Sequence, residues 1–201
     1  MCIRDSAYLS LIKGRTIIAE APTGLGKTAA SLASALAAMK KSENVKKILF
    51  LTGRQSQHKI VIDTIRKLND NRKDHPNVAI VDLIGRESMC GKLTIDRQCF
   101  CEEGVSEKAR GGRRSQLKRW ILEWPRHVEE TVKNGRIEGT CPYMCCIEAA
   151  REAEIIVMDY NHVFVESVSD SSLPSMSIDV GSSIVIAVSY THLTLPTRLP
   201  V

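Results

Sequence analysis

Residues 16–28 read TIIAEAPTGLGKT, a short apolar run that enters a glycine-rich loop ending in Lys27 and Thr28. An Ala-rich stretch follows, so the order is strand, loop and helix, as a phosphate-binding loop requires. Gly24 and Gly26 lack a Cβ, which lets the backbone wrap tightly and point its N–H groups at phosphate oxygens. We therefore predict a nucleotide site formed by Ala21, Pro22, Thr23, Gly24, Leu25, Gly26, Lys27 and Thr28.

The last two residues of this loop carry the chemistry. Lys27 would reach the β- and γ-phosphates as a point charge, and the Thr28 hydroxyl would bind Mg²⁺. The alternative is a glycine-rich turn that binds nothing. The register of Gly, Lys and Thr, together with the flanking strand and helix, favours the nucleotide site.

Length and composition set the class of protein. The chain has 201 residues, 43% of them hydrophobic, which is enough for one substantial domain or for one domain with an insertion. No apolar run approaches the ~20 residues that cross a bilayer, and the N-terminus lacks a signal-peptide pattern. We expect a cytoplasmic protein without a membrane partner, associated with the nucleoid if the source is prokaryotic. In that reducing compartment, seven Cys indicate metal or cluster ligation rather than disulfides.

Both ends of the chain resemble translated adapter sequence. These are residues 1–6, which read MCIRDS, and residues 188–201, which include VSYTHLTLPT. We exclude both segments from the prediction of the fold. The remainder is expected to be a fragment of a longer protein.

The rest of the chain alternates strands and helices. We predict strands at 15–19, 47–52, 77–84, 155–158 and 183–187, and helices at 28–41 and 56–69. The strands are continuous apolar runs, which are typical of a parallel sheet buried on both faces. The alternation predicts a doubly wound α/β sheet. The Ser-rich segment 165–183 is expected to be a loop.

Residues 52–57, TGRQSQ, follow the second predicted strand. Loops at the carboxyl ends of parallel strands form the binding face of such a sheet. Thr52, Arg54 and Gln55 could therefore contact a phosphodiester backbone. The alternative is a solvated turn in which Ser56 caps the next helix.

The α/β pattern stops at Gly85 and resumes only at Ile155, and this interval holds six of the seven Cys. Cys99 and Cys101 would point to the same side of an extended segment. Cys141 precedes Pro142, a favoured first helical residue, so the helix dipole would stabilise its thiolate. Four thiolates could hold zinc or an iron–sulfur cluster, and spacing does not choose between them. The remaining pair is expected to be small buried residues on that helix: Cys145 and Cys146.

The same interval is basic. Residues 106–136 contain nine Lys or Arg and four Glu, a net charge of +5 that equals the excess of the whole chain. Arg119, Arg126 and Lys133 lie opposite an apolar helical stripe that contains both Trp residues, and Pro125 should kink or interrupt the helix. The basic face would attract nucleic acid, or it is only a solvated surface.

Taken together, these motifs resemble the XPD-type family of superfamily 2 DNA helicases. The resemblance rests on EAPTGLGKT at 20–28, LTGRQSQHKIVIDTIRKL at 51–68, GRESMC at 85–90 and CPYMCCIEAAREAEIIVMDYNHVF at 141–164. It implies a RecA-like P-loop motor that uses ATP and Mg²⁺ and moves along single-stranded or forked DNA, as in DNA repair. It also implies a 4Fe-4S cluster held by Cys90, Cys99, Cys101 and Cys141. One residue separates Cys99 from Cys101, whereas archaeal relatives have two.

The expected organisation follows from this resemblance. The chain would comprise residues 7–84 as the first part of motor domain 1, 85–146 as the inserted cluster domain and 147–187 as the continuation of the motor, between tails at 1–6 and 188–201. The acidic box that family members carry after the last strand is absent, as is the second motor domain of the same polypeptide. The fragment alone should bind nucleotide weakly and not hydrolyse it. Two other hypotheses are a zinc-stabilised nucleic-acid-binding P-loop module without motor activity and a P-loop ATPase that acts on protein.

Overall fold

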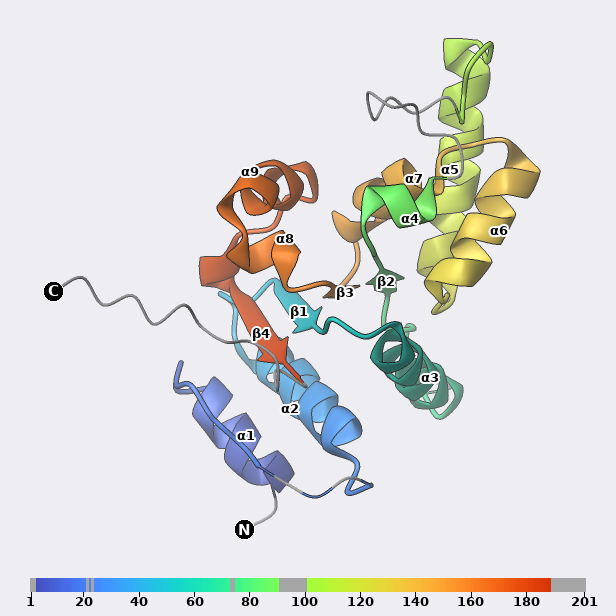
Figure 1. Ribbon diagram of the computed structural model, residues 1–201. Helices are drawn as coiled ribbons and strands as arrows, with labels where there is room; N and C mark the ends of the chain where they lie inside the picture. The colour runs from blue at the N-terminus through green and yellow to red at the C-terminus, as the bar shows by residue number, and fades with distance from the viewer. Residues whose placement is uncertain (1–2, 21, 23, 73–74, 91–100, 189–201) are drawn as a thin grey trace, which may run out of the picture.

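The computed structural model describes residues 3–20, 22, 24–72, 75–90 and 101–188 (Figure 1). In these residues, four parallel strands form one sheet in the order β2-β3-β1-β4. The strands are β1 (Lys47–Leu51), β2 (Ile80–Asp82), β3 (Ile155–Met158) and β4 (Ser183–Ala187). β3 pairs directly with β1, although about a hundred residues of chain separate them. The predicted α/β parallel-sheet fold is therefore confirmed.

Helices cover both faces of the sheet. Ile48 and Phe50 of β1 point to the face covered by α2 (Lys27–Lys41) and α3 (Gln55–Asp70). Leu49 and Leu51 point to the opposite face. There they share a core with α5 (Glu107–Glu123), α6 (Val128–Glu138) and α7 (Pro142–Ala150). Burial on both sides explains why the strands are uniformly apolar, and it makes the interval between β2 and β3 part of the main core.

Shorter elements complete the described part of the chain. α1 (Ile3–Leu11) packs on α2, where the Ser34 hydroxyl donates to the Arg4 carbonyl at 2.8 Å. α4 (Arg86–Met89) follows β2, and α8 (Asn161–Phe164) follows β3. Among the described residues, no helix is both long enough and apolar enough to span a membrane.

The strand predicted at residues 15–19 does not form, so that prediction was wrong. The segment is exposed, with Ile18 at 85%. A cavity of about 480 Å³, lined by residues 16–19 and 184–188, separates it from β4. The apolar run therefore lies beside the sheet edge without the ladder hydrogen bonds that define a strand.

The segment 165–183, expected to be a loop, contains the helix α9 (Glu166–Ser175). Serine usually disfavours a helix interior because its side chain competes for backbone groups. Here the hydroxyls of Ser169, Ser171 and Ser175 each donate to the carbonyl three residues earlier, so they do not interrupt the helix. Ser172 is buried, and Met176 and Ile178 beyond the helix join the core. Tertiary packing outweighs the local preference.

The predicted interruption at Pro125 is confirmed. α5 ends at Glu123, and α6 starts at Val128 with His127 as its N-cap. The Glu130 carboxylate accepts from the His127 N–H at 2.8 Å, which completes a capping box. The predicted apolar stripe is thus divided between two helices that pack against each other.

Candidate nucleotide site and nucleic-acid pocket

The phosphate loop has the backbone that its glycines predict. Gly24 has φ 90° and Gly26 has φ 69°, conformations that L side chains rarely adopt. Gly26 is the N-cap of α2, so the next N–H groups lie at a helix N-terminus, where anions are favoured. Pro22 and Leu25 are exposed; Ala21 and Thr23 lie outside the described residues. The local geometry is suited to bind phosphate.

Lys27 and Thr28 begin α2. The Lys27 ammonium donates to the Pro22 carbonyl at 2.9 Å, which holds it over the loop. Thr28 is half-buried in the first helical turn, and its carbonyl accepts from the Ser31 hydroxyl at 3.0 Å. A bound phosphate would replace the Pro22 carbonyl as the partner of Lys27.

The residues of the 52–57 loop differ in their exposure to solvent. Thr52 is fully buried: its N–H donates to the Met158 carbonyl at 3.1 Å, and its hydroxyl accepts from the Arg54 N–H at 3.4 Å. Arg54 and Gln55 are exposed at the start of α3. Thr52 therefore shapes the loop, whereas Arg54 and Gln55 can reach a ligand.

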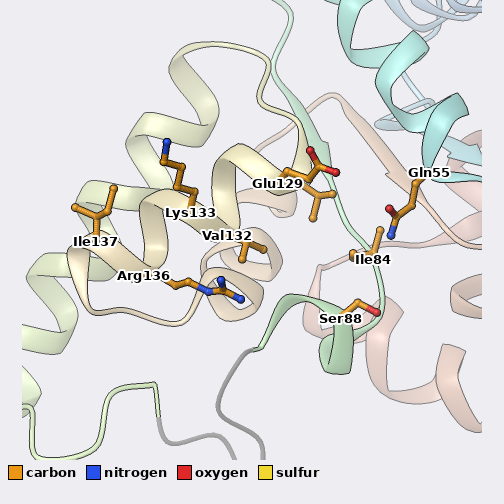
Figure 2. Close-up of a pocket in the computed structure, with 9 residues that line it drawn as sticks. Gln55, Ile84, Ser88, Glu129, Val132, Lys133, Arg136 and Ile137 are labelled. Carbon is orange, nitrogen blue, oxygen red and sulfur yellow. The ribbon is translucent and has the colours of Figure 1, made fainter.

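A pocket of about 530 Å³ lies between this loop and α6. We call it the α3/α6 pocket; it is lined by Gln55, Ile84, Ser88, Val128, Glu129, Val132, Lys133, Arg136 and Ile137. Figure 2 shows Gln55, Ile84 and Ser88 facing α6 across the pocket, with Arg136 extending toward them. The floor is apolar, and on the α6 side the cations of Lys133 and Arg136 outnumber the carboxylate of Glu129. This lining suits a nucleic-acid strand, whose phosphates need cations and whose bases need apolar contacts.

The other predicted basic residues lie elsewhere. Arg119 is exposed on α5 and lines a smaller pocket with Lys118 and Glu152. Arg126 lies in the α5–α6 connection with its guanidinium 4.1 Å from the centre of the Trp120 ring. Trp120 itself packs against the core, as expected. Of the three predicted basic residues, Lys133 alone lines the α3/α6 pocket.

A buried cluster at the end of β2 was not predicted. The Asp82 carboxylate lies 2.5 Å from the His58 Nδ1 through one oxygen, and its other oxygen accepts from the Val128 N–H at 2.8 Å. His127 Nε2 lies 3.7 Å from that second oxygen. The sequence did contain a signal. His58 lies on the same face of α3 as Val61, Ile62 and Ile65, so its burial followed from helical spacing.

Among the predicted ligands, Cys90 and Cys101 come together. Their sulfurs are 3.3 Å apart, with Cys90 directly after α4. Cys141 is the N-cap of α7, as predicted, and Cys99 lies outside the described residues. No group of three or more His, Cys, Asp or Glu side chains is placed to hold a metal ion within the described ranges, which omit 91–100. The four-Cys set therefore remains a prediction.

Glu102 links the segment of Cys101 to Cys141. Its carboxylate accepts from the Cys141 N–H at 3.2 Å, from the Thr140 hydroxyl at 2.6 Å and from Arg114 Nε at 2.9 Å. Burial alone would raise the pKa of Glu102, but the hydrogen bonds from Arg114, Thr140 and Cys141 lower it to about 2. This ionised carboxylate holds the segments of Cys101 and Cys141 close to each other.

Cys145 and Cys146 are fully buried on α7, as expected for small core residues. Burial raises the pKa of the Cys145 thiol to about 12 and also raises that of Cys146. Their burial among core residues fits a packing role.

The family comparisons cover most of the chain. Residues 50–188 match the DEAD_2 family, and residues 3–93 match the DEAD/DEAH box helicase family. A curated relative, the regulator of telomere elongation helicase 1 of Rattus norvegicus, is 30% identical over 99 residues. That match covers 49% of this chain and 7% of the relative.

Solved structures agree on the fold. A structure described as XPD helicase superimposes with a TM-score of 0.60 at 20% identity, covering 92% of this chain and 31% of that one. A truncated XPD superimposes with a TM-score of 0.59 at 20% identity, covering 92% of this chain and 50% of that one. The chain thus spans at most half the length of these relatives.

Proposed function

Since this chain belongs to the DEAD_2 family and is an XPD-type superfamily 2 helicase fragment, we propose that it is the N-terminal portion of an ATP-dependent iron–sulfur DNA helicase. The intact protein would translocate on single-stranded or forked DNA in a repair process. That substrate would place it in the cytoplasm, at the nucleoid in a prokaryote.

The observation that carries the proposal is the phosphate loop at the start of α2. Gly26 in the left-handed conformation caps the helix, and Lys27 is held over the loop. ATP would bind with its β- and γ-phosphates at these N–H groups, Lys27 would neutralise their charge, and Thr28 would hold Mg²⁺. Hydrolysis also needs a carboxylate to position water, and none follows β4 at Ala187 and Val188.

The nucleic-acid contact is assigned to the α3/α6 pocket. Gln55 on one wall and Lys133 and Arg136 on the other would contact successive phosphates, with Arg54 beside them. Such contacts carry no base information, so binding would be independent of sequence. This is what translocation along any strand requires.

The metal would be held by Cys90, Cys99, Cys101 and Cys141. Cys90 and Cys101 are adjacent, and Glu102 holds the segment of Cys141 near that of Cys101, which fits a four-thiolate centre. When bound, a 4Fe-4S cluster would cross-link these segments and stabilise the wall beside the DNA.

A second candidate is supported by the sulfur separation. Two thiolates on one tetrahedral Zn²⁺ with bonds of about 2.3 Å lie roughly 3.8 Å apart, whereas each thiolate of a cubane cluster binds a different iron and lies farther from the others. The 3.3 Å between Cys90 and Cys101 is nearer to the zinc value. A zinc-stabilised nucleic-acid-binding module without motor activity therefore remains the alternative.

One preparation tests both candidates. The full-length polypeptide, purified anaerobically, should contain iron and labile sulfide, and single-stranded DNA should stimulate its ATP hydrolysis. Zinc without iron or sulfide, and no stimulation by DNA, would support the zinc module. Lys27→Ala provides the control, because it should abolish hydrolysis without changing the metal content.

A further inference from the structure

Asp82 connects two segments that lie on opposite sides of the α3/α6 pocket. One carboxylate oxygen lies 2.5 Å from His58 Nδ1 in α3, and the other accepts from the Val128 N–H, the first residue of α6. Asp82 and His58 are each only 2% exposed. A single buried carboxylate thus contacts both walls of the pocket.

The partners of His58 favour its protonated form. Its Nδ1 faces Asp82, and its Nε2 lies 3.4 Å from the Thr52 carbonyl. A carbonyl oxygen only accepts, and a carboxylate oxygen can also accept, so the two ring nitrogens of His58 each face an acceptor, an arrangement that suits the doubly protonated ring. The pair is buried, and the ring is in contact with an acceptor at both ends.

The surrounding charges agree with this arrangement. Burial lowers the pKa of His58, but hydrogen bonds to Asp82 and Thr52, with the charges of Asp82 and Asp159, raise it overall. His127 lies beside the pair: its Nδ1 accepts from the Glu129 N–H at 3.4 Å, and its Nε2 lies 3.7 Å from Asp82. The carboxylates of Asp82 and Asp159 therefore favour the protonated form of His58.

We propose that the His58–Asp82 pair is a positioning unit that sets the spacing between the 52–57 loop and α6, and thereby the affinity of the α3/α6 pocket for single-stranded DNA. His58 supports the loop through the Thr52 carbonyl, beside Arg54 and Gln55. Asp82 fixes the N-terminus of α6, the helix that carries Lys133 and Arg136 (Figure 2). The inference rests on the proposed function only in that this pocket binds DNA.

A second attachment between α3 and α6 provides a matched control. Arg66 donates to the Pro125 carbonyl at 3.0 Å and pairs with Glu130, at side-chain exposures of 27% and 43%. It holds the same helix end but does not contact the 52–57 loop. The Arg66–Glu130 pair is partly exposed and should contribute less than the buried His58–Asp82 pair, so Arg66→Met should change the pocket much less.

The test uses the full-length protein and DNA-stimulated ATP hydrolysis. Asp82→Asn keeps the shape and can still accept from Val128, but it removes the charge opposite His58. We expect the oligothymidine concentration for half-maximal stimulation to rise about tenfold, while the maximal rate and the KM for ATP stay unchanged. A merely structural defect would instead lower the maximal rate through loss of active protein. Arg66→Met should change the half-maximal concentration less than twofold.

Other outcomes are decisive as well. His58→Gln provides a second, uncharged variant, and it should behave like Asp82→Asn. The proposal would be overturned if Asp82→Asn and His58→Gln both fold and both keep the wild-type oligothymidine concentration for half-maximal stimulation. It would also be overturned if both variants fail to fold while Arg66→Met folds. If Lys133→Ala combined with Arg136→Ala also leaves DNA stimulation unchanged, the pocket is not the DNA site and the proposed function fails instead.

Discussion

The phosphate loop and the α3/α6 pocket are built in opposite ways. The loop is one contiguous stretch, residues 21–28, whose geometry depends on two glycines with positive φ. The pocket gathers Gln55, Ser88 and Lys133 from three distant parts of the chain. Local sequence therefore determines the first site, whereas packing of the sheet and the helices determines the second.

The two sites also differ in where their charge lies. Lys27 is exposed and can move from the Pro22 carbonyl to a phosphate. The charges that set the walls of the pocket, those of His58 and Asp82, are buried and do not contact ligand. A change in the loop should therefore affect chemistry, and a change behind the pocket should affect DNA affinity.

Removing the loop cation should have the largest effect and should affect hydrolysis alone. We expect Lys27→Ala to lower the ATP hydrolysis rate of the full-length protein at least ~100-fold, because charge stabilisation of the transferred phosphoryl group is lost. Affinity for single-stranded DNA, measured by fluorescence anisotropy without nucleotide, should stay within twofold of the wild type. A parallel loss of DNA affinity would show that the two sites are not separate.

Cysteine variants test whether the metal site is independent of the nucleotide site. We expect Cys141→Ser to reduce metal affinity at least ~10-fold. Loss of a residue that only contacts a ligand already costs about 10- to 100-fold, and Cys141 is a proposed ligand. Cys145→Ser should retain the metal, because Cys145 is fully buried among core residues. Metal content by mass spectrometry and nucleotide affinity by calorimetry give the two readouts. Equal metal loss in both variants would contradict the assignment.

Removing the two cations that line the pocket should weaken DNA binding and leave the phosphate loop unaffected. Lys133→Ala combined with Arg136→Ala removes two phosphate contacts. The slope of log affinity against log salt should then fall by about 1.4, since each single-strand contact accounts for roughly 0.7. Lys41→Ala, an exposed cation at the end of α2, is the control and should not alter the slope. An unchanged slope in the double variant would place the DNA elsewhere.

The sequence alone predicted the secondary-structure elements and loops that depend on neighbouring residues. Apolar runs gave β1, β3 and β4, alanine content gave α2, and Cys141 before Pro142 gave the start of α7. The register of Gly26 and Lys27 gave the left-handed N-cap of α2, and nucleotide binding at this loop stays a prediction. Each of these features depends on neighbours in the chain.

The predictions that were wrong or missing concern features that depend on residues far apart in the sequence. Residues 15–19 are as apolar as a strand but do not reach the edge of β4. Ser172 is helical because α9 packs on the core. The His58–Asp82 contact joins residues 24 positions apart, and the connection to Val128 spans 46. Helical spacing indicates that His58 is buried, but no local pattern identifies its partner.

The smallest predicted effect concerns the charge behind the pocket. The folded pKa of His58 lies above its ordinary value of 6.5, so its contribution to stability is complete below about pH 6.5 and is lost as pH rises through the folded pKa. The free energy of unfolding of the wild type should therefore decline from pH 6 to pH 9 relative to His58→Gln, whose side chain does not titrate. Urea denaturation measures this difference, and because other groups titrate equally in both proteins, their contributions cancel. Nucleotide affinity should not follow the same profile, since Lys27 lies at the other site; parallel declines would show that the buried pair supports both.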